Sequence, residues 1–210
     1  MMKKFFTLSA LLAMSMAANA QSSPYTGVAV GDIQDGESYY IYNVDFGTWL
    51  GDNKRNKVFG WTSHAELGSH GRNFTFEIND AGWTINPKTG GNHSLNAVGL
   101  YMDTGRNKSK WTPTAITYGD VSNVMEFSGE VVWDKNELQT KTLSVNDSGD
   151  MDEACGKHNV WQLVSREERL EHALNNASEE NPINISGLIL GGTFPVADDY
   201  RNVPGPWVGE

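Results

Sequence analysis

The sequence predicts an all-β fold built from three similar lobes. Between residues 37 and 165, short runs of aromatic and β-branched residues alternate with Gly, Asn and Asp turns, and helical periodicity is absent. Three stretches share one plan, an apolar strand, a Gly-containing turn and a returning apolar strand; they are residues 39–51, 82–96 and 123–134. Because a unit of this size cannot bury its apolar face alone, the repetition favours a closed body in which three lobes share one core.

The lobes repeat at a nearly constant interval. Anchoring them on Tyr40, Trp83 and Val124 gives spacings of 43 and 41 residues. Each lobe also closes on a further strand with an aromatic residue at or near its start; these strands are expected at residues 73–78, 110–116 and 160–165. We expect Trp83, Trp111 and Trp161 to fill the core.

The first twenty residues predict a signal peptide. Lys3 and Lys4 supply its positive start, residues 5–16 its apolar run, and Ala18 to Ala20 its small-residue cleavage site. The run is shorter than the roughly 20 residues that a membrane-spanning helix needs. We therefore expect secretion to the periplasm or beyond, with cleavage after Ala20 and a leader over residues 21–36 that settles against the first strand.

A linker helix is predicted after the third lobe, over residues 166–180. Ser165 and Glu168 have the spacing of a capping box, in which each side chain satisfies a backbone N–H group at the helix start. Asn181-Pro182 would end the helix. An apolar stripe at helical spacing is expected to pack on the β domain; it consists of Leu170, Ala173, Leu174 and Ala177.

Residues 181–210 predict the incomplete start of a second β-rich module. They begin as a strand and continue in Pro, Gly and Asp. Unpaired edge strands promote aggregation. We therefore expect this segment either to lie on the first domain or to be poorly ordered.

The predicted mature chain is acidic. Without Lys3 and Lys4 it holds 14 Lys and Arg against 26 Asp and Glu, a formal charge of −12. Nucleic acids are bound through clustered Lys and Arg, so we expect no nucleic-acid partner. The short apolar run at residues 5–16 predicts no membrane insertion. Cys155 is the only cysteine, which excludes an internal disulfide. We expect a monomer stabilised by apolar burial.

The three-lobed closed arrangement is that of the β-trefoil, and the chain resembles ricin-type and related trefoils. "VWQLVS" at 160–165 is similar to their Q-x-W strand, and "DFGTWL" at 45–50 to their turn-then-Leu element. The chain is also similar to secreted Bacteroidota proteins with an amino-terminal trefoil-like module; the segments that carry this resemblance are 39–51, 67–76, 160–184 and 181–194. In that family a helix follows the trefoil and a second β-rich module, often of the carbohydrate-binding type, follows the helix.

No arrangement of catalytic residues stands out, so we expect neither an enzyme nor a cofactor. The close pair His64 and His70 has no third ligand at helical spacing, and we interpret both as loop residues. Asp150, Asp152 and Glu153 form an acidic loop in which alternate carboxylates could hold calcium. The loop lacks the full twelve-residue calcium pattern. We interpret it as a solvated acidic turn and predict no metal site.

The predicted function is non-catalytic binding of a neutral glycan or glycoprotein, a role that suits the targeting part of a larger extracellular protein. Sugars offer hydroxyl groups and an apolar ring face, so their sites combine Asp, Asn or Gln with an aromatic ring. The candidate residues lie around the turns of the lobes: Asp45, Trp49, Asn53 and His64 in lobe one; Asn92, Asn96, Tyr101 and Asp103 in lobe two; Trp133, Asp134, Asn136 and Gln139 in lobe three.

Two alternatives stay open on the sequence alone. The first concerns Trp49, which either fills the core or serves as a ligand platform. Its neighbour Leu50 is the better core candidate, and Trp49 lies on the opposite face of the same strand. The second concerns function. A trefoil can also present its loops to proteins, as a protein-interaction or protease-inhibitor module, or the chain can be a structural fragment without a ligand.

Overall fold

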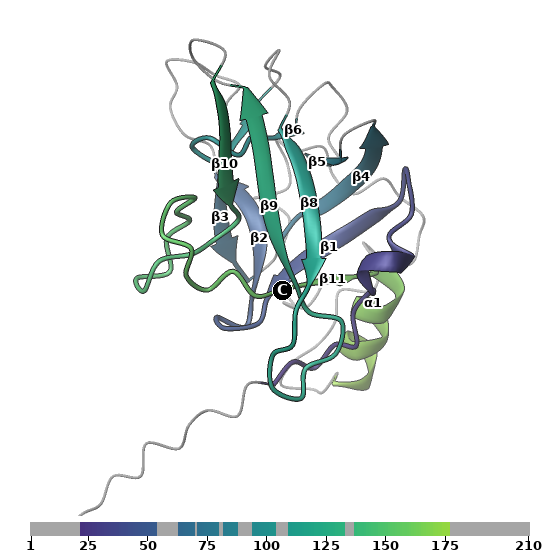
Figure 1. The fold of residues 1–210 in the computed structure, drawn as a ribbon. Helices are drawn as coiled ribbons and strands as arrows, with labels where there is room; N and C mark the ends of the chain where they lie inside the picture. Colours follow the sequence, from purple (N-terminus) through teal and green to yellow (C-terminus); the bar gives the residue numbers. More distant parts are fainter. Residues whose placement is uncertain are drawn as a thin grey trace, which may run out of the picture.

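The computed structural model describes residues 22–53, 63–69, 71–79, 82–87, 94–103, 109–132 and 137–176. This part of the chain is mostly β sheet with a single α-helix, which confirms the all-β prediction (Figure 1). Its elements are η1 (Val30–Asp32), β1 (Ser38–Asn43), β2 (Thr48–Asn53), β3 (Ser63–Gly68), β4 (Asn73–Asn79), β5 (Gly82–Pro87), β6 (Ser94–Leu95), β7 (Tyr101–Asp103), β8 (Lys110–Ala115), β9 (Met125–Val132), β10 (Leu138–Thr142), β11 (Trp161–Val164) and α1 (Arg166–Asn175).

The strands form one eleven-stranded antiparallel sheet. Its path is β10-β9-β8-β5-β4-β1-β2-β3-β7-β6, and β11 pairs with both β1 and β9. The end strands β10 and β6 do not pair with each other within the described residues, so the sheet as a whole is not a barrel. Six strands nevertheless pair in a closed circuit, from β1 through β4, β5, β8, β9 and β11 back to β1.

The pairing register recurs three times within this circuit. The first and last circuit strands of each lobe pair through one corresponding set of residues: Tyr39 with Phe74, Trp83 with Trp111, and Met125 with Trp161. Neighbouring lobes pair through a second corresponding set, each residue two places further along its strand: Phe76 with Ile85, Pro113 with Phe127, and Leu163 with Ile41. The predicted closing strands are therefore all present, whereas the trefoil itself stays a prediction.

The core lies inside this circuit and is built from the same residues. Six of the corresponding positions, two from each lobe, have side chains with 0% exposure; they are Ile41, Phe74, Ile85, Trp111, Phe127 and Trp161. The Trp111 indole N–H donates to the Leu95 carbonyl at 2.9 Å, and the Trp161 indole N–H donates to the Leu143 carbonyl at 2.6 Å. Both polar groups are thus satisfied despite burial. Trp83 is only partly buried, but it packs against this core as expected.

The prediction of a turn within residues 123–134 is wrong. Residues 125–132 form one continuous strand, β9, and the returning strand is β10. Gly129 lies mid-strand, where a Cβ atom would stand 2.7 Å from the Ala97 Cβ and 2.8 Å from Cζ3 of Trp111. The glycine therefore allows close packing of the core on the strand.

The leader packs against the circuit through backbone hydrogen bonds to β11 and β4. The Val28 N–H donates to the Leu163 carbonyl at 2.7 Å, and the Gly36 N–H donates to the Phe76 carbonyl, also at 2.7 Å. The Glu168 carboxylate in α1 accepts from the backbone N–H groups of Thr26 and Gly27. The leader thus joins the sheet to the helix (Figure 1).

Helix α1 is present, and its buried face agrees with the predicted one at Ala173 but not at Leu174. Ser165 caps it as expected, since its hydroxyl accepts from the Glu168 N–H at 3.0 Å. The buried residues of the helix are Arg169 and Ala173, whereas Leu174 is 45% exposed. The predicted all-apolar stripe is therefore wrong at Leu174, because a buried arginine faces the sheet in its place.

Several predictions lie outside the described residues. They concern the signal peptide at 1–20, the end of the linker helix with Ala177, the second module at 181–210, and His70. Among the residues that are described, no helix is long and apolar enough to cross a membrane.

Candidate functional site

Trp49 belongs to a buried aromatic group. It is 5% exposed, and its ring centroid lies 4.8 Å from that of Tyr42 and 5.1 Å from that of Tyr25. The Arg169 guanidinium lies over the Trp49 and Tyr40 rings, 4.0 Å and 4.1 Å from their centroids. These contacts favour the core-filling alternative for Trp49, because a sugar platform needs an exposed ring face.

Burial of this aromatic group raises the pKa of two of its tyrosines. Removal from water raises the pKa of Tyr40 to about 12, and the nearby Arg169 charge only partly offsets the shift. Burial likewise raises the pKa of Tyr25 to about 12. Both hydroxyl groups therefore stay protonated under ordinary conditions, and the group works as packing.

Two candidates from different lobes are brought together. His64 on β3 is paired with Tyr101 on β7, and their ring centroids lie 3.9 Å apart. Both side chains are partly buried. The nearby side chains of Asn53 and Asp103 lie outside the described residues. The structure therefore joins lobe one to lobe two at this ring pair.

The remaining candidates of lobes two and three are divided. Asn96 is buried, and its side-chain oxygen accepts from the Val98 N–H at 3.0 Å and from the Ser109 hydroxyl at 3.1 Å. Those bonds give it a structural role in a loop. Gln139 is partly buried on β10, opposite Val131. The other candidates fall outside the described residues; they are Asn92, Trp133, Asp134 and Asn136.

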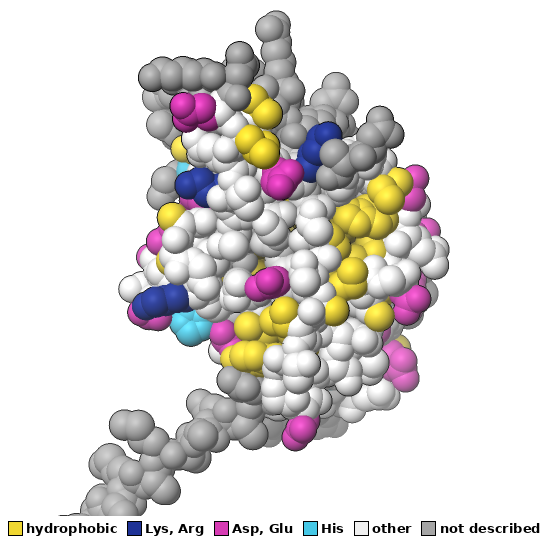
Figure 2. Space-filling model, in the orientation of Figure 1, with side chains coloured by type: hydrophobic (Ala, Val, Ile, Leu, Met, Phe, Trp, Pro, Cys, Tyr) yellow, Lys and Arg dark blue, Asp and Glu magenta, His cyan; other side chains and the backbone are white. Residues whose placement is uncertain are grey.

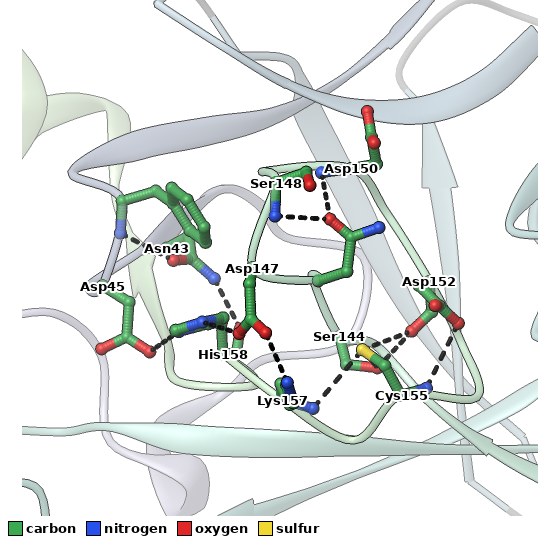
Figure 3. A network of polar contacts seen from close by, with 12 residues as sticks. Asn43, Asp45, Ser144, Asp147, Ser148, Asp150, Asp152, Cys155, Lys157 and His158 are labelled. Atoms are coloured by element: carbon green, nitrogen blue, oxygen red, sulfur yellow. Dashed lines mark hydrogen bonds and ion pairs between the residues drawn. The ribbon is translucent and has the colours of Figure 1, made fainter.

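Asp45 is the candidate that lies in a polar group of side chains. Its Oδ1 accepts a hydrogen bond from the Tyr118 hydroxyl, and its Oδ2 lies 2.8 Å from Nδ1 of His158. On the other side of the ring, Nε2 of His158 lies 3.3 Å from Oδ1 of Asp147 (Figure 3). We call Asp45, Phe46, Tyr118, Asp147, Lys157 and His158 the His158 cluster.

The outer part of the His158 cluster is exposed and charged. The side chains of Asp147 and Lys157 are 69% and 56% exposed and form an ion pair. The hydrogen bond from Lys157, together with one from His158, lowers the pKa of Asp147 below its usual value. The same bond from Lys157 to Asp147 raises the pKa of Lys157. Figure 2 shows acidic, basic and histidine side chains gathered at the lower left edge of the face it displays.

The inner part of the cluster is held by Asn43, which is fully buried at the end of β1. Its side-chain nitrogen donates to the His158 carbonyl at 2.9 Å, and its side-chain oxygen accepts from the Phe46 N–H at 3.0 Å. His158 adopts a φ of 41°, a left-handed backbone that histidine occupies uncommonly. The Phe46 ring meets the imidazole edge to face at 5.0 Å. Backbone and ring of His158 are therefore both fixed.

The loop between β10 and β11, residues 143–160, supports Asp147 through its own turns. Asn146 accepts from the N–H groups of Ser148 at 2.9 Å and Asp150 at 3.1 Å. Asp152 accepts from the Ala154 N–H at 2.9 Å, and Glu153 accepts from the Gly99 N–H at 3.1 Å. The side chains of Asp152 and Glu153 thus bind backbone N–H groups. No group of three or more potential metal ligands occurs within the described residues.

Sequence reasoning missed Tyr118, Asp147, Lys157 and His158. Asp45 and His158 are separated by 113 residues, so no local spacing connects them. The lone signal was the composition of the loop, in which Asp, Lys and His alternate with Asn, Ser and Gly. No family model, curated protein or solved structure matches the chain.

Proposed function

We propose that the three lobes form a β-trefoil that serves as a secreted, non-catalytic glycan-binding module. Support for the trefoil comes from the register that recurs between Tyr39 and Phe74, Trp83 and Trp111, and Met125 and Trp161. It also comes from the closed circuit that these pairs complete. Such a body leaves the loops between strands free to carry ligand contacts.

The His158 cluster is the proposed ligand site. It combines two carboxylates, an imidazole and an ammonium group with the partly buried rings of Phe46 and Tyr118, and Asp147 projects from it with 69% exposure. Neutral glycans are recognised by polar groups of this kind beside an aromatic surface. The observation that carries the proposal is the convergence of Asp45, from the turn between β1 and β2 at residues 44–47, with Asp147 and His158 of the β10–β11 loop (Figure 3).

A glycan array with the mature chain tests the proposal. Asp147→Asn should abolish specific sugar binding with an unchanged circular dichroism spectrum, because it removes charge from an exposed group. Asp32→Asn, which alters an exposed aspartate in the leader helix η1, should leave binding intact. Trp49→Ala is unsuitable for this purpose, since Trp49 is buried. Two results would overturn the proposed site: no sugar binding by the unmodified chain, or equal sugar binding by Asp147→Asn and Asp32→Asn.

A second candidate function is protein interaction. Val132 and Leu138 are paired across β9 and β10, and they are 48% and 62% exposed. Figure 2 shows hydrophobic side chains at the upper ends of these strands. A blank array together with inhibition of a protease panel would favour this function, and a blank result in both would favour a structural fragment without a ligand.

A further inference from the structure

We propose that His158 is a protonation-controlled latch between the β1–β2 turn and the β10–β11 loop. The ring lies between two carboxylates that belong to these two segments. Asp45 Oδ2 is 2.8 Å from Nδ1, and Asp147 Oδ1 is 3.3 Å from Nε2. The juxtaposition is direct and needs no bridging group.

Both contacts can be hydrogen bonds only when the imidazole carries two protons. An ionised carboxylate accepts hydrogen bonds and cannot donate them, whereas a neutral imidazole has one donor and one acceptor nitrogen. Neutral His158 would therefore turn a lone pair toward one of the two carboxylates. The doubly protonated ring makes two charge-assisted bonds, which are the stronger kind.

The surroundings decide which contact opens when the ring loses a proton to water. The Asp45 contact is the shorter, and the Asp45 side chain is only 16% exposed, against 69% for Asp147. Asp45 is also held by the Tyr118 hydroxyl, and the His158 backbone is held by Asn43. The remaining proton therefore stays on Nδ1, and the bond to Asp147 is the one that is lost.

The other side chains around the ring do not change which of the two carboxylate contacts is lost. Lys157 pairs with Oδ2 of Asp147 and keeps that carboxylate ionised, so Asp147 cannot supply the missing proton. Phe46 packs against the ring and carries no charge. Cys155, three residues before His158 in the loop, donates to the Asp152 carbonyl at 3.3 Å. Opening of the latch thus frees one oxygen of Asp147 while the Lys157 pair remains.

One consequence for ligand binding rests on the proposed function. With the latch closed, Oδ1 of Asp147 accepts from His158 and Oδ2 accepts from Lys157. With the latch open, Oδ1 can accept a hydrogen bond from a ligand hydroxyl group. Sugar binding at the His158 cluster should therefore be stronger when His158 is neutral than when it is doubly protonated.

Nuclear magnetic resonance of the mature chain tests the latch without any ligand. The ring nitrogens of His158, assigned with His158→Gln, should both carry a proton at the acid end of a pH series and only Nδ1 at its alkaline end. The amides of residues 147–150 should become more mobile over the same range. In the neutral ring, Asp45→Asn should move the single N–H proton to Nε2, whereas Asp147→Asn should leave that proton on Nδ1.

Two results would overturn the latch. One is a neutral His158 with its proton on Nε2 in the unmodified protein. The other is an equal pH response of the 147–150 amides in His158→Gln, since that variant has no titrating ring. His64→Gln is the matched control and should keep the full response. Because no sugar is present, a failed latch and a failed glycan site remain distinguishable.

Discussion

The Arg169 guanidinium lies 4.0 Å from the centroid of the Trp49 ring, and this contact packs helix α1 against the first lobe. Arg169 is 1% exposed, and its guanidinium also lies over Tyr40. A desolvated cation–π contact contributes up to about 2 kcal/mol. The arginine therefore occupies a place on the helix that an apolar residue would ordinarily take.

Arg169→Ala should lower the free energy of unfolding by about 2–4 kcal/mol, because it removes the packed stem and the contacts with two rings. Urea denaturation followed by tryptophan fluorescence measures the loss. Glu171→Ala changes an exposed position of the same helix and should cost less than about 0.5 kcal/mol. Equal stability of the two variants would show that Arg169 does not anchor the helix.

Alkaline pH should destabilise the fold through Tyr40. Its pKa is about 12 in the folded protein, whereas an exposed tyrosine has a pKa of 10.0. The folded chain thus keeps a proton that the unfolded chain releases, so this contribution is complete below pH 10 and is lost as the pH rises toward 12. The loss should reach about 2–3 kcal/mol. Unfolding at a series of alkaline pH values measures it. Tyr40→Phe should remove the part of the dependence that comes from Tyr40 and leave the part that comes from Tyr25, whose pKa burial also raises to about 12.

Gly129→Ala should destabilise the protein by about 1–3 kcal/mol through overpacking. The added Cβ would stand 2.7 Å from the Ala97 Cβ and 2.8 Å from the Trp111 ring. Gly68→Ala is the matched control in another strand, because no atom lies within 4 Å of its added Cβ. Thermal unfolding compares them. A neutral Gly129→Ala would show that β9 does not approach the core this closely.

Trp111→Phe and Trp161→Phe should each cost about 1–3 kcal/mol, since each leaves a buried carbonyl without its donor. The carbonyls belong to Leu95 and Leu143. Because the two indoles occupy corresponding places in two lobes, their losses should be similar. Calorimetry on both variants checks this. A loss at one site and none at the other would contradict the correspondence.

Much of the scaffold could be predicted from sequence because its signals are local. Each closing strand has an aromatic residue near its start and is bounded by Gly, Asn or Asp at a turn. These signals identified the three strands that carry Phe74, Trp111 and Trp161. Gly129 misled the prediction, because the same residue type serves turns and close packing. Only the neighbouring strand distinguishes the two roles.

The candidate site was predictable only at Asp45. The contacts of Asp45 with Tyr118 and His158 span 73 and 113 residues, and they arise from folding of the lobes on one another. Arg169 was missed for a related reason. A charged residue in an acidic helix predicts a solvated position, and only the Tyr40 and Trp49 rings opposite it make its burial favourable.

The most direct test of the threefold arrangement is the set of short cross-strand proton contacts that nuclear magnetic resonance detects between backbones. The account predicts such contacts for all three corresponding pairs: Tyr39 with Phe74, Trp83 with Trp111, and Met125 with Trp161. Each of these pairs belongs to one of the six strand pairings of the circuit. Absence of any one of the three contacts, or a pairing shifted by one residue in a single lobe, would contradict the trefoil.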